Sequence, residues 1–242
     1  RVNELCFAPA GSVLYSAASD GLIRAWDCKA KPADKPSCEL RDPTAPEEEV
    51  WSLSLGTGHT LAAGTEGAVV IWDLRKAARP LCRWEVHTEA VTQVHFFEGG
   101  KRLLSGSMDG LVCELDASQI EEDDAVLTVL NNEAPISALG VHGSTASPRA
   151  HVLSTLETIS LWELGSGDRF ALLDSIRSQD TVTGGDAAGG DAGGSTRLGG
   201  GAGVAGEPGR GSQVDYLIGC QWDERTQQLL LLTGAHSGAI CI

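Results

Sequence analysis

The fold is decided by a stretch that recurs along the chain, and its clearest copy, residues 61–75, reads LAAGTEGAVVIWDLR. Two apolar segments flank the pair Glu66-Gly67. Such a pair predicts a tight hairpin turn, because glycine adopts a positive φ at no steric cost and the acidic side chain can accept a backbone N–H. Residues 68–72 are mostly β-branched and apolar, which favours a strand between packed layers. The stretch therefore predicts an antiparallel hairpin that ends at a buried Trp72.

The same pattern returns at regular intervals. The positions equivalent to Trp72 are spaced by 46, 43 and 47 residues and comprise Trp26, Leu115 and Trp162. The turns at residues 20–21 and 109–110 match Glu66-Gly67. A fifth unit begins near Val214, and its tryptophan position would directly follow Ile242. A period in the mid-forties with several short strands per unit is typical of a propeller blade.

Each unit is expected to end in an outer strand. Polar tracts follow the tryptophan positions and lead to short apolar segments at residues 38–40, 81–86, 125–130 and 170–176. No long amphipathic helix is predicted. The fold class expected from these patterns is all-β.

The recurring Trp-Asp pairs resemble those of the WD-repeat family. Trp26-Asp27 and Trp72-Asp73 close units that carry the acidic-Gly turn in register. The resemblance implies a β-propeller that is incomplete, with about five of seven blades. Because the family's ring usually has seven blades, one further unit is expected before Arg1 and one after Ile242. A chain that begins with arginine rather than methionine is likewise expected to be a fragment. As given, the first and last blades are expected to expose an apolar face, so the isolated chain should aggregate or fold poorly.

Several strings resemble one particular member of that family. They occupy residues 90–94, 107–112, 122–128 and 214–219. The domain organisation expected is a single propeller. Residues 1–183 form blades one to four, residues 184–212 form a Gly-rich disordered insert, and residues 213–242 form a partial fifth blade.

The resemblance also implies a hydrogen-bonded tetrad of His, Ser/Thr, Asp and Trp in each unit. His87 and Asp109 are in place in the third unit, but Leu115 replaces its Trp. The His position of the first unit precedes residue 1, and units two, four and five substitute it with Pro46, Asn132 and Arg210. We therefore expect the blades to be held by fewer side-chain hydrogen bonds than complete units would have. Their stability should come mainly from the burial of apolar side chains.

Composition excludes several classes of protein. Of the 30 glycines, 13 fall within residues 184–211, and 42% of residues are apolar, so a collagen-like or wholly disordered chain is excluded. The net charge of −15 argues against binding to nucleic acid or to an anionic membrane, since both need clustered Lys and Arg. Seven scattered cysteines without a C-x-x-C pair favour an intracellular protein, cytoplasmic or nuclear.

Patterns for catalysis or cofactor binding are missing. Residues 201–206 form a formal G-x-G-x-x-G, but it lies in low-complexity sequence rather than between a strand and a helix. The six histidines have no metal-ligand spacing with the cysteines. We therefore expect no enzyme, no cofactor and no metal.

The function expected is a non-catalytic scaffold that binds other proteins. In propellers of this family, partners often meet the face near the turn between the second and third strands. The expected contact residues stand just before the turn acids or at matching positions, and they are Ser19, Thr65, Met108, Thr155 and His236. Trp51 could be an exposed anchor, but its strand parity with Leu53 favours packing between blades.

An alternative function comes from residues 61–75. They resemble the WD-x-Arg box of substrate receptors for cullin–RING ubiquitin ligases, in which the Arg contacts an adaptor that is itself a propeller. The resemblance implies that Trp72, Asp73 and Arg75 form the adaptor contact, with Arg75 on the solvent side and free to pair with an acidic partner. A polar surface residue is the alternative interpretation of Arg75.

Overall fold

The computed structural model describes residues 1–30, 35–144, 146–173, 216–223, 225–226, 228–234 and 240–241. The chain divides into two compact units, Arg1–Leu172 and Leu173–Ile242, which are described separately. The insert predicted at residues 184–212, Arg210 and His236 lie outside the described residues.

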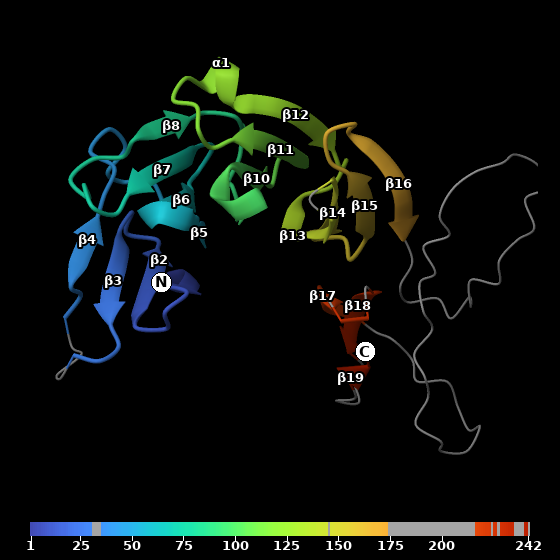
Figure 1. Ribbon diagram of the computed structural model, residues 1–242, viewed down its shortest axis with the longest axis horizontal. Coiled ribbons are helices and arrows are strands. Elements are labelled where there is room, and N and C mark those ends of the chain that lie inside the picture. Colours follow the sequence, from blue (N-terminus) through green and yellow to red (C-terminus); the bar gives the residue numbers. More distant parts are fainter. Residues whose placement is uncertain are drawn as a thin grey trace, which may run out of the picture. The chain divides into compact units, whose positions relative to one another are not determined.

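Four antiparallel sheets of four strands follow one another in the first unit (Figure 1). Each sheet runs in simple chain order. The first comprises β1 (Val2–Phe7), β2 (Val13–Ala18), β3 (Ile23–Asp27) and β4 (Cys38–Leu40), and the second comprises β5 (Ser52–Leu55), β6 (Thr60–Gly64), β7 (Val69–Asp73) and β8 (Cys82–Trp84). The third comprises β9 (Gln93–Phe97), β10 (Arg102–Gly106), β11 (Leu111–Asp116) and β12 (Val126–Asn131), and the fourth comprises β13 (Ile136–Ser144), β14 (Ser147–Ser154), β15 (Ile159–Glu163) and β16 (Asp168–Leu173).

The second unit contains a three-stranded antiparallel sheet, formed by β17 (Tyr216–Asp223), β18 (Gln228–Gly234) and β19 (Ile240–Cys241). Helical structure in the described ranges is limited to single turns, namely α1 (Glu122–Ala125), η1 (Thr57–His59) and η2 (Glu98–Gly100). The all-β class and the five repeated units expected from the sequence are confirmed. The segment expected to begin an outer strand at Ala125 instead ends α1, and β12 starts one residue later.

The core lies between neighbouring sheets. Strand β7 is buried on both faces, and its side chains alternate between two clusters. Val70 and Trp72 pack toward the first sheet, whereas Val69 and Ile71 pack toward the third. A strand with period-two alternation can be apolar throughout only when both faces are covered. The β-branched run that precedes Trp72 is therefore explained by its place between two layers.

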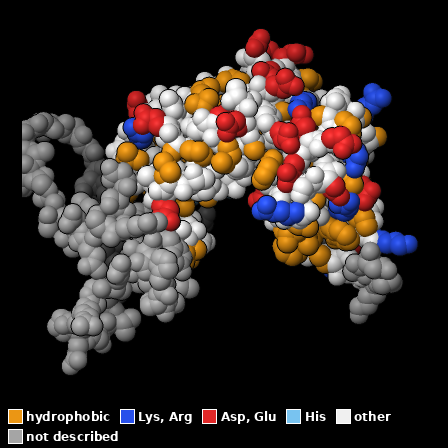
Figure 2. Space-filling model, turned by 180° about the vertical axis from the view of Figure 1, so that it is seen from behind, with side chains coloured by type: hydrophobic (Ala, Val, Ile, Leu, Met, Phe, Trp, Pro, Cys, Tyr) orange, Lys and Arg blue, Asp and Glu red, His pale blue; other side chains and the backbone are white. Residues whose placement is uncertain are grey.

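The first sheet has an exposed apolar face. Val2, Leu5 and Phe7 on β1 are each more than half exposed. Hydrophobic side chains gather over this sheet in Figure 2. An apolar face on the first blade was expected from the sequence.

His87 holds the third sheet together through two hydrogen bonds. Its Nδ1 lies 3.1 Å from Asp109 Oδ2, and its Nε2 lies 2.9 Å from Ser105 Oγ. Burial lowers the pKa of His87 despite the nearby carboxylate, so the neutral ring donates to Asp109 and accepts from Ser105. Asp109 also accepts the backbone N–H groups of Thr88 and Leu111. The absent tryptophan does not disrupt this network, because Leu115 is simply buried.

Other sheets contain substitutes for the tetrad. In the fourth sheet Trp162 Nε1 donates to Ser160 Oγ at 2.7 Å, and the Ser160 hydroxyl donates to Asn132, which stands at the histidine position. In the second sheet, where Pro46 takes the histidine position, Arg83 Nη2 binds Glu48 at 2.8 Å. The expectation that the sheets are stabilised mainly by burial stays a prediction, but the loss of the tetrad does not leave these blades without polar contacts. Polar networks are retained, but different residue types build them.

Replacing His87 tests this network. In His87→Ala, the partly buried Asp109 and the buried Ser105 lose their shared partner, which should lower the free energy of unfolding by about 2–3 kcal/mol. Thr88→Ala is the matched control, because it truncates an exposed neighbour and keeps the backbone N–H; it should cost under about 0.5 kcal/mol. Urea denaturation followed by tryptophan fluorescence measures both, and equal stability of the two variants would refute the role of His87.

Candidate functional site

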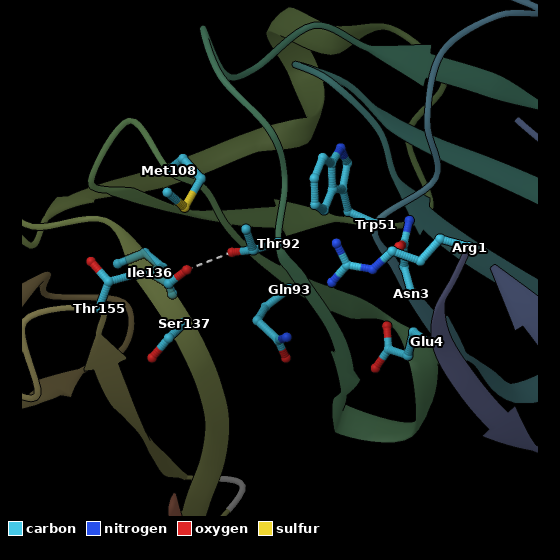
Figure 3. Close-up of a pocket in the computed structure, with 10 residues that line it drawn as sticks. All are labelled: Arg1, Asn3, Glu4, Trp51, Thr92, Gln93, Met108, Ile136, Ser137 and Thr155. Atoms are coloured by element: carbon cyan, nitrogen blue, oxygen red, sulfur yellow. Dashed lines mark hydrogen bonds between the residues drawn. The ribbon is translucent and has the colours of Figure 1, made fainter. Parts of the chain in front are cut away.

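A pocket of about 270 Å³ lies where the inner strands of the first four sheets begin (Figure 3). One group of lining residues comes from the starts of inner strands, and comprises Arg1, Asn3, Glu4, Trp51, Thr92, Gln93, Ile136 and Ser137. A second group, Met108 and Thr155, comes from the turns that follow β10 and β14. The pocket is therefore assembled from four sequence repeats.

Two β-bulges direct adjacent side chains to the pocket. The register of β1 against β2 shifts at Asn3, and that of β13 against β14 shifts at Ser137. In a regular strand, consecutive side chains point to opposite faces. With the bulges, Asn3 and Glu4 both line the pocket, as do Ile136 and Ser137. Parity read from the sequence does not reveal this arrangement.

The structure brings together two of the five expected contact residues. Met108 and Thr155 both line the pocket. Ser19 lies beside Arg1, whose backbone carbonyl accepts hydrogen bonds from the Ser19 backbone N–H and hydroxyl, but it does not line the pocket. His236 is outside the described residues, and its role stays a prediction.

Thr65 does not occupy the position assumed for it. The backbone N–H of Thr65 donates to Ala68 at 2.9 Å, and the equivalent bond in the third sheet joins Ser107 to Leu111 at 3.1 Å. Two residues lie between Thr65 and Ala68, whereas three lie between Ser107 and Leu111, so the turn in the second sheet is one residue shorter. Thr65 therefore corresponds to Ser107, is buried, and bonds Ala68 through its hydroxyl. The exposed equivalent of Met108 is Glu66.

The shorter turn also changes the role of Gly67. The sequence predicts a positive φ at this glycine, as observed at Gly21 and Gly110, but Gly67 does not adopt one. Instead, the carbonyl oxygen of His87 lies 3.1 Å from where a Cβ on Gly67 would stand. The His87 backbone N–H donates to the Gly67 carbonyl in the same contact. Glycine favours this close approach of two backbones, because a Cβ would force the His87 carbonyl to move by a few tenths of an ångström.

Trp51 lines the pocket instead of packing within a core cluster. It stands one residue before β5, and its backbone N–H donates to Gly64 at 2.8 Å. The expectation of packing between blades is wrong, because the apolar neighbours that enter the core are Val50 and Leu53. The indole Nε1 is removed from solvent but has no hydrogen-bond partner in the described part of the chain.

Asn3 presents a second unsatisfied polar atom. Its side-chain nitrogen donates to Glu49 Oε1 at 2.9 Å and to the Val50 carbonyl at 2.8 Å. These bonds fix the amide so that Oδ1 is buried without a partner among the described residues. Unsatisfied buried polar atoms are rare in proteins. The pocket wall contains one such donor, on Trp51, and one such acceptor, on Asn3.

Glu4 gives the pocket an unusual carboxylate. Its Oε2 accepts the backbone N–H of Leu53 at 2.5 Å, which links β1 to β5. Burial raises the pKa of Glu4 to about 7, only partly offset by this hydrogen bond. No cation of the described residues is close enough to lower it. Sequence reasoning missed Glu4, because only the bulge at Asn3 turns it to the pocket.

The Trp72-Asp73-Leu74-Arg75 segment has a compact local geometry. Trp72 is buried, and Arg75 binds Asp73 through Nε at 2.9 Å and Nη2 at 2.8 Å. This pairing lowers the pKa of Asp73 to about 2. The Arg75 side chain remains 65% exposed, as expected, but its guanidinium is already paired within the segment. Arg75 is therefore exposed to solvent as expected, but its guanidinium already has an acidic partner in Asp73.

The buried histidines form no metal centre in the described residues. His142 and His151 lie on paired strands with their Nδ1 atoms 3.4 Å apart. Burial lowers the pKa of each to about 4, so both rings are neutral at neutral pH. No group of three metal-ligating side chains is found in the part of the chain that the structure describes. In the same part, no helix is long and apolar enough to cross a membrane.

Comparisons with known proteins agree with the repeat pattern. The family model described as "WD domain, G-beta repeat" matches residues 1–27 and 78–113. The WD repeat-containing protein GTS1 of Arabidopsis thaliana is 33% identical over 73% of this chain and 45% of its own length. The WD repeat-containing protein 89 homolog of Dictyostelium discoideum is 29% identical over 98% of this chain and 57% of its own length. This is the particular member that the sequence strings resemble.

Solved structures show the same fold. A chain in the crystal structure of the mitotic checkpoint complex matches with a TM-score of 0.61 and 21% identity, over 72% of this chain and 52% of that chain. At this identity the likeness shows the fold alone. The present chain spans about half the length of the curated relatives it matches.

Replacing Glu4 tests the electrostatics of the pocket. Because the folded state raises the pKa of Glu4 above its unfolded value of 4.5, its contribution is present below pH 4.5 and is lost as pH rises through about 7. Glu4→Gln should therefore be more stable than the parent at pH 8, by the order of 1 kcal/mol, with the difference shrinking toward pH 4.5. Urea titrations at both pH values measure this, and a pH-independent difference would contradict the burial of an ionised carboxylate.

Proposed function

Because the chain is a WD-repeat propeller and resembles WD repeat-containing protein 89, we propose that it is a non-catalytic scaffold that binds other proteins. WD-repeat proteins are generally protein-interaction scaffolds. The observation that carries the proposal is the pocket at the starts of the inner strands. It joins the turn residues Met108 and Thr155 to the half-buried carboxyl group of Glu4, in a hollow that a protein segment could enter.

The net negative charge of the chain favours one class of partner. A net charge of −15 favours proteins with basic surfaces over nucleic acids or anionic membranes. Six cysteines of the described residues are unpaired thiols, which supports an intracellular location, cytoplasmic or nuclear. We assign no cofactor and no catalytic residue.

Proximity labelling with the full-length protein tests the scaffold role. Met108→Lys places a positive charge on the pocket wall, which repels a basic partner, and should lower the labelling of pocket-dependent partners at least about tenfold, as expected for a disrupted contact worth ~1.4 kcal/mol. Ser118→Lys is the matched control, since it adds the same residue at an exposed position at the opposite end of the third sheet. Identical partner sets from the two variants would exclude the pocket as the binding site.

The alternative function is a substrate receptor of a cullin–RING ubiquitin ligase. It is favoured by the exposure of Arg75 next to the buried Trp72. The pairing of Arg75 with Asp73 weakens it, because an acidic group of an adaptor would have to compete with that carboxylate or share the guanidinium.

Pull-down with the propeller adaptor of these ligases separates the two functions. If the alternative holds, Arg75→Ala should reduce adaptor recovery at least about tenfold, through loss of a charge-assisted contact. Lys29→Ala is the control, because Lys29 stands at the same offset after Trp26-Asp27. Unchanged recovery with Arg75→Ala would exclude the ligase function while leaving the scaffold proposal intact.

A further inference from the structure

We propose that the pocket binds an arginine or lysine side chain presented by an extended, basic segment of a partner protein, with Glu4 as the group that receives the cation. This inference rests on the scaffold function proposed above and names the chemistry of its partner.

The first support is a carboxylate without a cation. Glu4 is half-buried on the pocket wall, and within the described ranges its Oε2 accepts a hydrogen bond from the Leu53 backbone N–H alone. Buried carboxylates are normally paired with a cation or fully hydrogen-bonded, because an isolated charge is costly away from water. In the ranges that the structure describes, no cation pairs with Glu4. A cation supplied by a partner would complete the site.

The second support is the pair of unsatisfied atoms. Trp51 Nε1 is a donor that lacks an acceptor, and Asn3 Oδ1 is an acceptor that lacks a donor. Neither atom is open to the pocket in this structure, so an extended peptide, whose residues each carry a carbonyl and an N–H, would pair with them only after the Trp51 and Asn3 side chains turn. An acidic or purely apolar ligand would leave the Glu4 carboxylate unpaired.

The third support is the shape and chemistry of the walls. The pocket volume of about 270 Å³ accommodates one long side chain, and Trp51, Gln93 and Met108 offer aromatic, amide and thioether surfaces. Aliphatic stems of arginine and lysine pack on such surfaces while the head seeks a charge. In Figure 3 the Arg1 side chain extends toward Trp51 and Gln93, so one guanidinium already enters this space. Arg1 does not act on the pKa of Glu4, and its side chain would compete with the ligand.

Fluorine NMR of the 5-fluorotryptophan-labelled protein tests the proposal. The probe is the peptide acetyl-Ala-Arg-Ala-amide, and the control probe is acetyl-Ala-Glu-Ala-amide. Trp51→Phe assigns the Trp51 resonance. We expect the arginine peptide to shift this resonance saturably and the glutamate peptide to leave it unmoved. Equal shifts with both peptides, or no shift with either, would overturn the proposal.

Variants separate the cation site from general effects on folding. Glu4→Gln should weaken binding of the arginine peptide at least tenfold, and Gln93→Lys should abolish it by placing a positive charge on the wall. Arg1→Ala should strengthen binding by removing the competing guanidinium, a gain that a damaged fold could not produce. Unchanged affinity in Glu4→Gln would refute the role of Glu4.

The two proposals fail differently. If the arginine peptide does not bind but Met108→Lys still loses partners in proximity labelling, the scaffold function stands and the cationic ligand is wrong. If Met108→Lys and Ser118→Lys label the same partners while the peptide binds, the pocket recognises a cation but is not the scaffold surface.

Discussion

Burial of both faces of each inner sheet is the constraint on which the structure depends. Strand β7 illustrates it, because Val70 and Trp72 fill one interface while Val69 and Ile71 fill the next. Each sheet therefore packs face to face against its neighbours in the chain, and the inner strands of successive sheets take equivalent positions. The pocket is a consequence of this stacking, since it collects residues at or next to the starts of β1, β5, β9 and β13.

Polar networks adapt to that framework more freely than the apolar core does. A hydrogen bond between His87 and Asp109 ties the turn of the third sheet to the chain that precedes it. In the fourth sheet a hydrogen bond between Ser160 and Asn132 has the same role. In the second sheet, which lacks the histidine, Arg83 on β8 binds Glu48, which lies 35 residues earlier in the chain. Different chemical solutions therefore tie down similar backbones, provided that each buried polar group finds a partner. The unsatisfied atoms of Trp51 and Asn3 stand out against this background.

The repeat pattern predicts the fold well because one motif encodes both strand and turn. The order of the strands in the first four sheets, the outer strand β4, and the buried Trp72 and Leu115 follow from that pattern. The errors have a common origin in backbone register. A two-residue turn moves Thr65 from the surface to the interior, and the bulge at Asn3 brings Glu4 to the pocket. Residue type does not reveal such one-residue shifts, which reverse the direction of a side chain.

Photo-crosslinking in cells tests most directly whether partners are held at the inner ends of the sheets. A benzophenone amino acid would be introduced at position 108 on the pocket wall and, separately, at position 101 at the opposite end of the third sheet. The account predicts cross-links from position 108 to partner segments rich in lysine and arginine, identified by mass spectrometry, and few from position 101. Cross-links only from position 101, or to acidic segments, would contradict it.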